Sequence, residues 1–198
     1  HGPRTRRAMW AVFAASRPPS RTDRVVERTM SDNTTTYVLV TDGACSGNGT
    51  EASRGGWAAI LTAPDGKETV LTGGEMPTTN NRLVLLAALE GLWEAPAGSD
   101  VDLVTDSSYV AILKGWLAGW QRKGWRTASK QPVANRDLWE RMISELARHR
   151  KVRPVLVKGH AGHEANERAD RLAQEAAATA EPAPPREAYT DEQLGFSI

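Results

Sequence analysis

The sequence predicts an α/β fold in which a five-stranded mixed sheet is flanked by helices. Short apolar runs bounded by turn residues alternate with longer segments of helical periodicity, which is the first observation behind this prediction. The first three apolar runs are joined by short turns, whereas the later runs are separated by helical segments, so antiparallel and parallel pairs are both expected. At 198 residues with 40% hydrophobic content, the chain has enough apolar material for one core.

The first part of this pattern predicts three strands in hairpin order. They are expected over residues 37–41, 56–61 and 68–71. The turn P-D-G-K at 64–67 separates the second strand from the third. These strands are therefore expected to pair antiparallel with their neighbours in sequence.

The second part of the pattern alternates helices with strands. A helix is expected over 79–93, where T-T-N-N supplies capping residues and Pro96 and Gly98 follow the end. Strands are expected over 101–105 and 152–157. Helices are expected over 107–113, 135–149 and 164–178.

The two ends of the chain differ in composition from its middle. Residues 1–30 hold seven arginines and two acids, and are expected to form a disordered basic arm of upstream-translated or added sequence, since Met30 is a natural start. Residues 31–180 are expected to form the domain, and residues 181–198 a flexible proline-rich tail. Cys45 is the one cysteine, which fits a reducing compartment and favours a cytoplasmic location. No membrane partner is expected, because the early apolar run at 8–15 is too short to span a bilayer.

Two predicted strands end in the same letters, L-V-T-D, at 39–42 and 103–106. If these strands are parallel neighbours, Asp42 and Asp106 emerge together, about 5 Å apart by strand spacing, where open α/β sheets usually place ligands. Two carboxylates this close repel each other unless a cation lies between them, and Mg²⁺ or Mn²⁺ is the natural choice. The alternative is that each aspartate only caps the turn or helix that follows it.

A third motif, K-G-H-A-G-H-E-A-N-E-R-A-D at 158–170, is a glycine-rich loop with two histidines that runs into a helix bearing Asp170. The motifs T-D-G-A-C-S-G-N, T-T-N-N-R and T-D-S-S-Y-V precede it, together with a tryptophan-rich basic stretch. With these motifs in this order, residues from about 36 to 178 resemble ribonuclease H of the bacterial HI type. His160 and His163 alone could instead suggest zinc, but no further soft ligand accompanies them.

The resemblance implies a ribonuclease H-like fold and an endonuclease that hydrolyses the RNA strand of RNA–DNA hybrids. It implies that Asp42, Asp106 and Asp170 ligate two Mg²⁺ ions about 4 Å apart, for which Mn²⁺ can substitute. It also implies that His160 assists proton transfer or product departure.

One position departs from the family pattern. The helix that begins T-N-N-R carries a glutamate two residues after the arginine in the family, and the resemblance implies that it holds the second metal and touches a ribose 2′-hydroxyl. Here this position is Val84. Glu90 lies six residues further on, on another face of the helix, so it cannot substitute. Cleavage in Mg²⁺ is therefore expected to be weak or absent.

The resemblance also implies how the hybrid is held. Ribose, base-edge and phosphate contacts are expected from Gly43, Cys45, Asn48, Thr79, Asn80 and Asn81. Simple N-capping is the alternative for the T-T-N-N segment. A basic handle is expected to contact the phosphate backbone of the hybrid through Trp116, Trp120, Lys123 and Arg126. The alternatives are that the two tryptophans only pack in the protein and that the basic residues form a solvated charged face.

Three functions fit these motifs to different degrees. The leading one is the metal-dependent hybrid endonuclease, acting as a monomer. The runner-up is a catalytically inactive hybrid-binding module of the same fold, which Val84 favours and the three aspartates disfavour. Another polynucleotidyl transferase of the fold, such as an integrase, is disfavoured by the complete K-G-H-A-G-H loop and the tryptophan-rich handle.

Overall fold

The sheet of this protein is mixed and has β1, β2 and β3 as antiparallel neighbours. In the computed structural model, which describes residues 36–111, 113, 115–158 and 163–182, the strand order is β5-β4-β1-β2-β3-β6. β4 pairs parallel with both β1 and β5. The strands are β1 (Thr36–Ser46), β2 (Arg54–Thr62), β3 (Glu68–Met76), β4 (Asp100–Thr105), β5 (Lys151–Leu156) and β6 (Glu181–Pro182).

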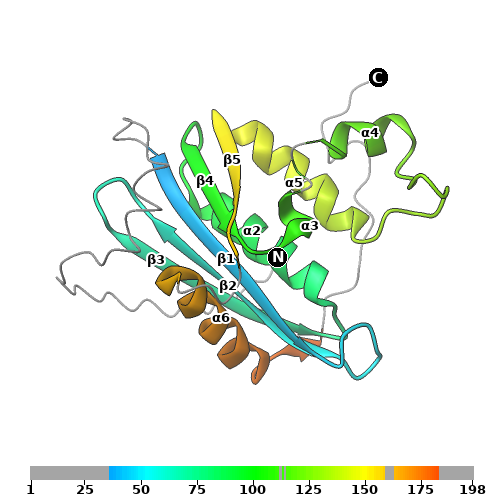
Figure 1. Cartoon of the computed structure of the whole chain (residues 1–198), viewed down its shortest axis with the longest axis horizontal. Coiled ribbons are helices and arrows are strands. Elements are labelled where there is room, and N and C mark those ends of the chain that lie inside the picture. The colour runs from blue at the N-terminus through cyan, green and yellow to red at the C-terminus, as the bar shows by residue number, and fades with distance from the viewer. Residues whose placement is uncertain (1–35, 112, 114, 159–162, 183–198) are drawn as a thin grey trace, which may run out of the picture.

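Helices cover both faces of this sheet (Figure 1). The helix α2 packs on β1 and β2 and is itself contacted by α5, whereas α6 packs on β1 and β2 from the other face. The described helices are α2 (Asn80–Glu94), α3 (Ser108–Ala111), α4 (Leu117–Arg122), α5 (Arg136–Arg148) and α6 (Glu164–Ala177).

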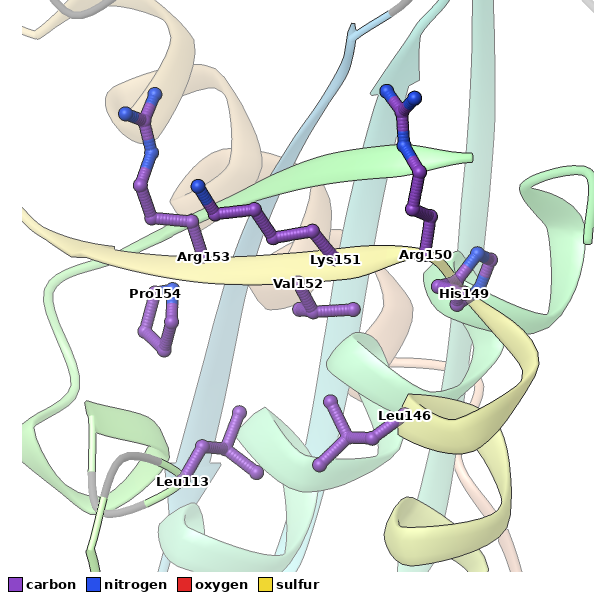
Figure 2. Close-up of a pocket in the computed structure, with 8 residues that line it drawn as sticks. All are labelled: Leu113, Leu146, His149, Arg150, Lys151, Val152, Arg153 and Pro154. Carbon is purple, nitrogen blue, oxygen red and sulfur yellow. The ribbon is translucent and has the colours of Figure 1, made fainter. Parts of the chain in front are cut away.

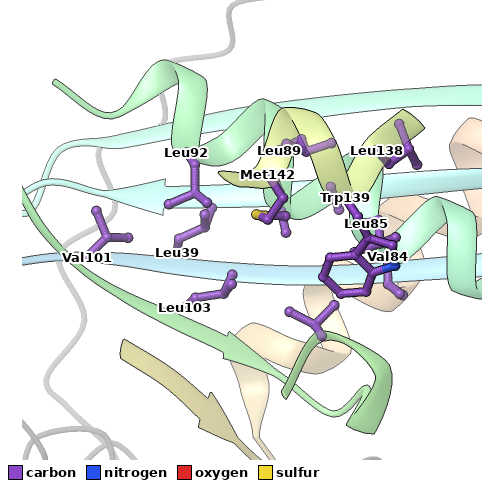
Figure 3. Close-up of a cluster of buried hydrophobic side chains, with 14 of the residues drawn as sticks. Leu39, Val84, Leu85, Leu89, Leu92, Val101, Leu103, Leu138, Trp139 and Met142 are labelled. Atoms are coloured by element: carbon purple, nitrogen blue, oxygen red, sulfur yellow. The ribbon is translucent and has the colours of Figure 1, made fainter. Parts of the chain in front are cut away.

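The alternation of side chains along β1 divides the core into two clusters. Leu39 belongs to the larger cluster beneath α2 and α5, and Val40 belongs to the smaller cluster beneath α6. Figure 3 shows the larger cluster, in which Trp139 and Met142 of α5 lie against the leucines of α2. Both faces of β1 are therefore buried, as in a central strand of a sandwiched sheet.

The predicted fold class is confirmed, with one difference in the strand count. Glu181 and Pro182 form a sixth, two-residue strand beside Glu75 and Met76 of β3, although the sequence predicts that they begin a flexible tail. The predicted basic arm over 1–30 and the rest of the predicted tail lie outside the described residues. Within the described part of the chain, no helix is both long enough and apolar enough to cross a membrane.

Several other elements differ from the prediction, among them β1, which was predicted over 37–41 and extends to Ser46. The strand predicted over 68–71 continues to Met76, and the helix predicted over 107–113 is described only as the four residues of α3. The short helix α4 was not expected as a separate element, since its sequence is dominated by tryptophan, glycine and basic residues.

Candidate active site

Asp42 and Asp106 lie at the same level of two neighbouring parallel strands. β1 and β4 are paired in a register in which Val40 is opposite Val104. Each aspartate stands two residues beyond this pair, so both emerge at the carboxyl end of the sheet. The predicted adjacency of the two L-V-T-D segments is therefore confirmed, at the edge where open α/β sheets usually bind ligands.

The helix α2 approaches the strand directly beside Asp42. A Cβ atom on Gly43 would lie 2.9 Å from Leu83 Cβ and 3.1 Å from Val84 Cγ1, which is closer than side chains normally pack. A residue without a side chain is therefore needed at Gly43 for α2 to reach β1. The same backbone turn fixes the carboxylate, since the Gly43 N–H donates to Asp42 Oδ1 at 2.7 Å.

Val84 faces the hydrophobic core at this point of the helix. Its side chain is 1% exposed and belongs to the same buried cluster as Leu85 and Trp139 (Figure 3). Glu90 is engaged elsewhere, because its Oε1 accepts from Arg141 Nη2 of α5 at 3.2 Å. The first turn of α2 contains no acidic residue, so this helix supplies no carboxylate beside Asp42.

The third predicted acid, Asp170, is carried by α6, which packs very close to the sheet. A Cβ atom on Gly56 of β2 would overlap the backbone of Ala173 and Ala177. This close approach lets α6 lie flat across β1 and β2, with its buried face made of alanines and Asn166. The helix therefore carries Asp170 on the same face of the sheet as the smaller core cluster.

Asn166 connects α6 to the end of β4. Its Nδ2 donates to Asp106 Oδ2 at 3.4 Å, and its Oδ1 is buried without a hydrogen-bond partner. Asp170 follows one helical turn later, and its Oδ1 accepts from Gln174 Nε2 at 2.9 Å. Asn166 was not among the predicted site residues, although its spacing of four residues before Asp170 in the third motif could have indicated it.

The donor set of this site consists of oxygen atoms, which suits a hard divalent cation. Asp42 and Asp106 are adjacent, and the unpaired Oδ1 of Asn166 is an additional buried acceptor that a hydrated cation could satisfy. In the part of the chain that the structure describes, no group of three or more His, Cys, Asp or Glu side chains is arranged to hold a metal ion. The residues thus fit a cation best at the pair of aspartates, and Asp170 is held by Gln174 instead.

Only one of the two histidines of the third motif lies within the described residues. His160 lies outside the described residues. His163 directly precedes α6 and is partly buried, and its side chain makes no capping hydrogen bond to the helix.

The predicted substrate loops contact each other at the start of α2. Asn80 N donates to Asn48 Oδ1 at 2.9 Å, which joins the loop after β1 to the helix. Thr79 is the N-cap residue of α2 and its side chain accepts from Arg82 N, so N-capping is one role of this residue. Burial raises the pKa of the Cys45 thiol. The structure therefore joins Asn48 to the start of α2, where Thr79, Asn80 and Asn81 follow one another, while Cys45 approaches Thr78 and Gly43 packs against α2.

The predicted handle separates into a buried and an exposed part. Trp120 is 9% exposed and packs edge-on against Trp139 at a centroid distance of 5.6 Å, so the packing alternative holds for this residue. Trp116 is 61% exposed, and its ring packs edge-on against that of Trp120 at a centroid distance of 6.0 Å. Lys123 and Arg126 are exposed beyond α4, and Arg126 Nη1 donates to Lys130 O.

A hollow elsewhere on the surface involves none of the predicted site residues. It has a volume of about 580 Å³ and lies beneath the edge strand β5. Figure 2 shows Val152 and Pro154 on one side of this space, with Leu113 and Leu146 opposite. The expected chemistry therefore does not lie in this apolar hollow.

Comparison with known proteins identifies relatives of the whole domain. Residues 34–178 match the family model described as RNase H. The chain is 51% identical over 147 residues to "Ribonuclease H" of Dinoroseobacter shibae, with 72% of this chain and 91% of the relative covered. It is also 51% identical over 152 residues to "Ribonuclease H" of Thermus thermophilus, with 75% of this chain and 89% of the relative covered.

A solved structure also resembles the chain. It is the crystal structure of LC9-RNase H1, described as a type 1 RNase H with the type 2 active-site motif. The TM-score is 0.64 at 29% sequence identity, and the similarity covers 75% of each chain.

Proposed function

The chain belongs to the ribonuclease H family, and from this premise we propose which residues carry its reaction. The protein is a hydrolase that acts on the RNA strand of RNA–DNA hybrids, which confirms the function expected from its motifs. The proposed catalytic carboxylates are Asp42, Asp106 and Asp170. The observation that carries this assignment is the register of β1 and β4, which brings Asp42 and Asp106 to one level of the sheet.

We assign two Mg²⁺ ions to this site, with Mn²⁺ as the substitute. When bound, such ions activate the attacking water and neutralise charge on the scissile phosphate. Asp42 and Asp106 would hold the first ion, and Asp170, whose Oδ1 accepts from Gln174 Nε2, would complete the ligand set. Asn166 orients the Asp106 carboxylate through its amide, as partners of metal ligands commonly do.

The remaining roles concern protons and substrate. His160 of the glycine-rich loop assists proton transfer or product departure. The exposed asparagines at 80 and 81, together with Asn48, approach the minor groove, where ribose hydroxyls are displayed. Thr79 receives a DNA-strand phosphate at the N-terminus of α2, where free N–H groups favour anions.

Val84 impairs cleavage in this assignment. It places a methyl-bearing side chain against the turn that follows Asp42, at the position where the family pattern has a carboxylate. Loss of a partner of a metal ligand typically costs about 10- to 100-fold in affinity or activity, and loss of a ligand should cost at least as much. A second metal would therefore be held weakly.

A catalytically inactive hybrid-binding module is the second candidate function. The observation that favours it is that Val84 is 1% exposed and packed in the core, so the position is well adapted to an apolar side chain. Such a module would keep the substrate-contacting loops and handle without turnover.

Cleavage of an end-labelled RNA–DNA hybrid distinguishes these functions. The chain as given and its Val84→Glu variant are compared in Mg²⁺ and in Mn²⁺, with Val84→Gln as a matched control of similar size and no charge. We expect Val84→Glu to cleave at least about 10- to 100-fold faster than the other two in Mg²⁺. Equal cleavage by all three would refute the role given to position 84. Hybrid binding without cleavage by any of them would support the binding module.

A further inference from the structure

A buried ionic cluster lies behind the substrate-facing loops. Arg82 Nε donates to Glu75 Oε1 at 2.7 Å, and Arg82 Nη1 donates to Asp137 Oδ2 at 2.7 Å. The side chains of Arg82 and Glu75 are only 6% and 8% exposed, and that of Asp137 is 22% exposed. Pairs this well shielded from water are rigid, because breaking one would leave an uncompensated buried charge.

One arm of the cluster fixes the segment that leads into α2. Thr78 Oγ1 donates to Glu75 Oε1 at 2.9 Å. Ser53 Oγ accepts from Thr78 N and donates to Thr78 O, both at 2.7 Å. Thr78 is thereby held on both sides, immediately before Thr79 and Asn80, which face the substrate in the proposed function.

The other arm reaches the helix that carries the handle. Asp137 lies in the first turn of α5, which begins ten residues after Arg126 of the handle. Trp139, two residues later, contacts Trp120 of α4. Arg82 therefore connects the start of α2, at residues 78–81, with the base of the handle.

The charges of this cluster explain why an arginine is needed. Arg82 places a cation in the N-terminal turn of α2, where the helix dipole disfavours positive charge. This turn contains no acidic residue that could balance the charge. Glu75 and Asp137 supply the missing negative charge from β3 and α5. The planar guanidinium can donate to both at once, whereas a lysine ammonium lacks this fork geometry.

We propose that Arg82 is a positioning residue whose bond to Asp137 sets the distance between the start of α2, at residues 78–81, and the handle. This bond governs how tightly the hybrid is held and leaves the chemical step unchanged. The inference rests on the proposed function, in which both parts contact one hybrid.

The test compares two ion pairs that join the same two helices. Asp137→Ala removes the Arg82 contact, and Glu90→Ala removes the contact of Glu90 with Arg141, which also links α2 to α5. Hybrid affinity is measured without divalent ions, and KM and kcat are measured in the Val84→Glu background. We expect Asp137→Ala to weaken hybrid binding and raise KM about tenfold with kcat unchanged, as for loss of one charged hydrogen bond. Glu90→Ala should change neither.

Two further variants keep the inference testable if Asp137→Ala is poorly folded. Asp137→Glu should restore affinity, and Arg82→Lys, which retains the charge without the fork, should weaken it like Asp137→Ala. Equal affinities for Asp137→Ala and Glu90→Ala would overturn the inference while leaving the proposed function intact. Failure of the unsubstituted chain to bind a hybrid would overturn both.

Discussion

Val84 lies against Gly43: a Cβ atom on Gly43 would stand 3.1 Å from Val84 Cγ1. Gly43 directly follows Asp42, so the apolar side chain of Val84 borders the turn that holds this carboxylate, which is catalytic in the proposed function. Because Gly43 has no side chain, α2 can lie this close to β1. One helix position therefore belongs to the core and also borders the proposed site.

This relationship predicts that stability becomes metal-dependent in the Val84→Glu variant. Without metal, the introduced carboxyl would be buried among apolar groups, which should lower the free energy of unfolding by about 1–3 kcal/mol. Mg²⁺ bound to the folded state should recover this loss. Thermal unfolding in EDTA and in Mg²⁺ measures both effects.

Val84→Gln is the control for this measurement, because it introduces polarity without a charge. Its melting temperature should fall in the same way but should not respond specifically to Mg²⁺. A melting temperature of Val84→Glu that Mg²⁺ leaves unchanged would show that position 84 is remote from the ion.

The three aspartates should be individually necessary for cleavage. In the Val84→Glu background, Asp42→Asn, Asp106→Asn and Asp170→Asn are each expected to lower the cleavage rate at least about 100-fold, because each removes a ligand. Asp65→Asn, in the exposed turn between β2 and β3, is the control and should cleave normally. Retention of full activity by Asp170→Asn would show that Gln174 holds this carboxylate away from the reaction throughout.

Asn166 should affect rate through Asp106. Asn166→Ala removes the amide that donates to Asp106 Oδ2, so we expect a rate about 10- to 100-fold lower in the Val84→Glu background. Glu175→Ala, at an exposed position of the same helix, is the control for general effects on α6. If higher Mg²⁺ concentration restores the rate of Asn166→Ala, the residue acts on ion binding. If both variants cleave equally, the hydrogen bond has no functional role.

The fold and the pair of aspartates could be predicted from the sequence because both depend on local patterns. Strand and helix periodicities can be recognised from consecutive residues. The repeated L-V-T-D segments likewise indicate two strand ends from consecutive residues. The end of β3 was missed because Gly73 and Gly74 resemble a turn. Their strand continues because Gly73 pairs with Trp57 of β2, which is a tertiary contact.

The ionic cluster could not be predicted, because its members are distant in sequence. Arg82 was seen only as part of T-T-N-N-R, and its partners lie seven residues before it and 55 residues after it. Neither Glu75 nor Asp137 belongs to a motif, and the bonds exist only once α2, β3 and α5 have packed. The difference between Trp116 and Trp120 could not be predicted for a similar reason, since α4 begins after Trp116 and leaves it exposed while Trp120 is buried.

Close packing of α6 on β2 predicts a strong effect of Gly56→Ala. The new methyl group would overlap the backbone of α6, so the helix must move, at a cost of about 1–3 kcal/mol. Because α6 carries Asp170, cleavage by the Val84→Glu background should fall as well. Gly119→Ala is the control, since its position in α4 is open and helical and should gain roughly 0.5–1 kcal/mol. Calorimetric or denaturant unfolding of both variants measures the difference, and equal stabilities would contradict it.

Hybrid binding should depend steeply on salt if the handle contacts the phosphate backbone. Each neutralised phosphate contributes roughly 0.9 to the slope of log affinity against log salt. Lys123 is exposed at the end of α4, so Lys123→Gln should reduce this slope by about that amount and weaken binding at low salt. Lys151→Gln is the matched control, because Lys151 is an exposed lysine on the edge strand β5, beside the hollow that contains no site residue. Fluorescence anisotropy of a labelled hybrid between about 50 and 200 mM salt gives the slopes, and equal slopes for both variants would exclude Lys123 from the interface.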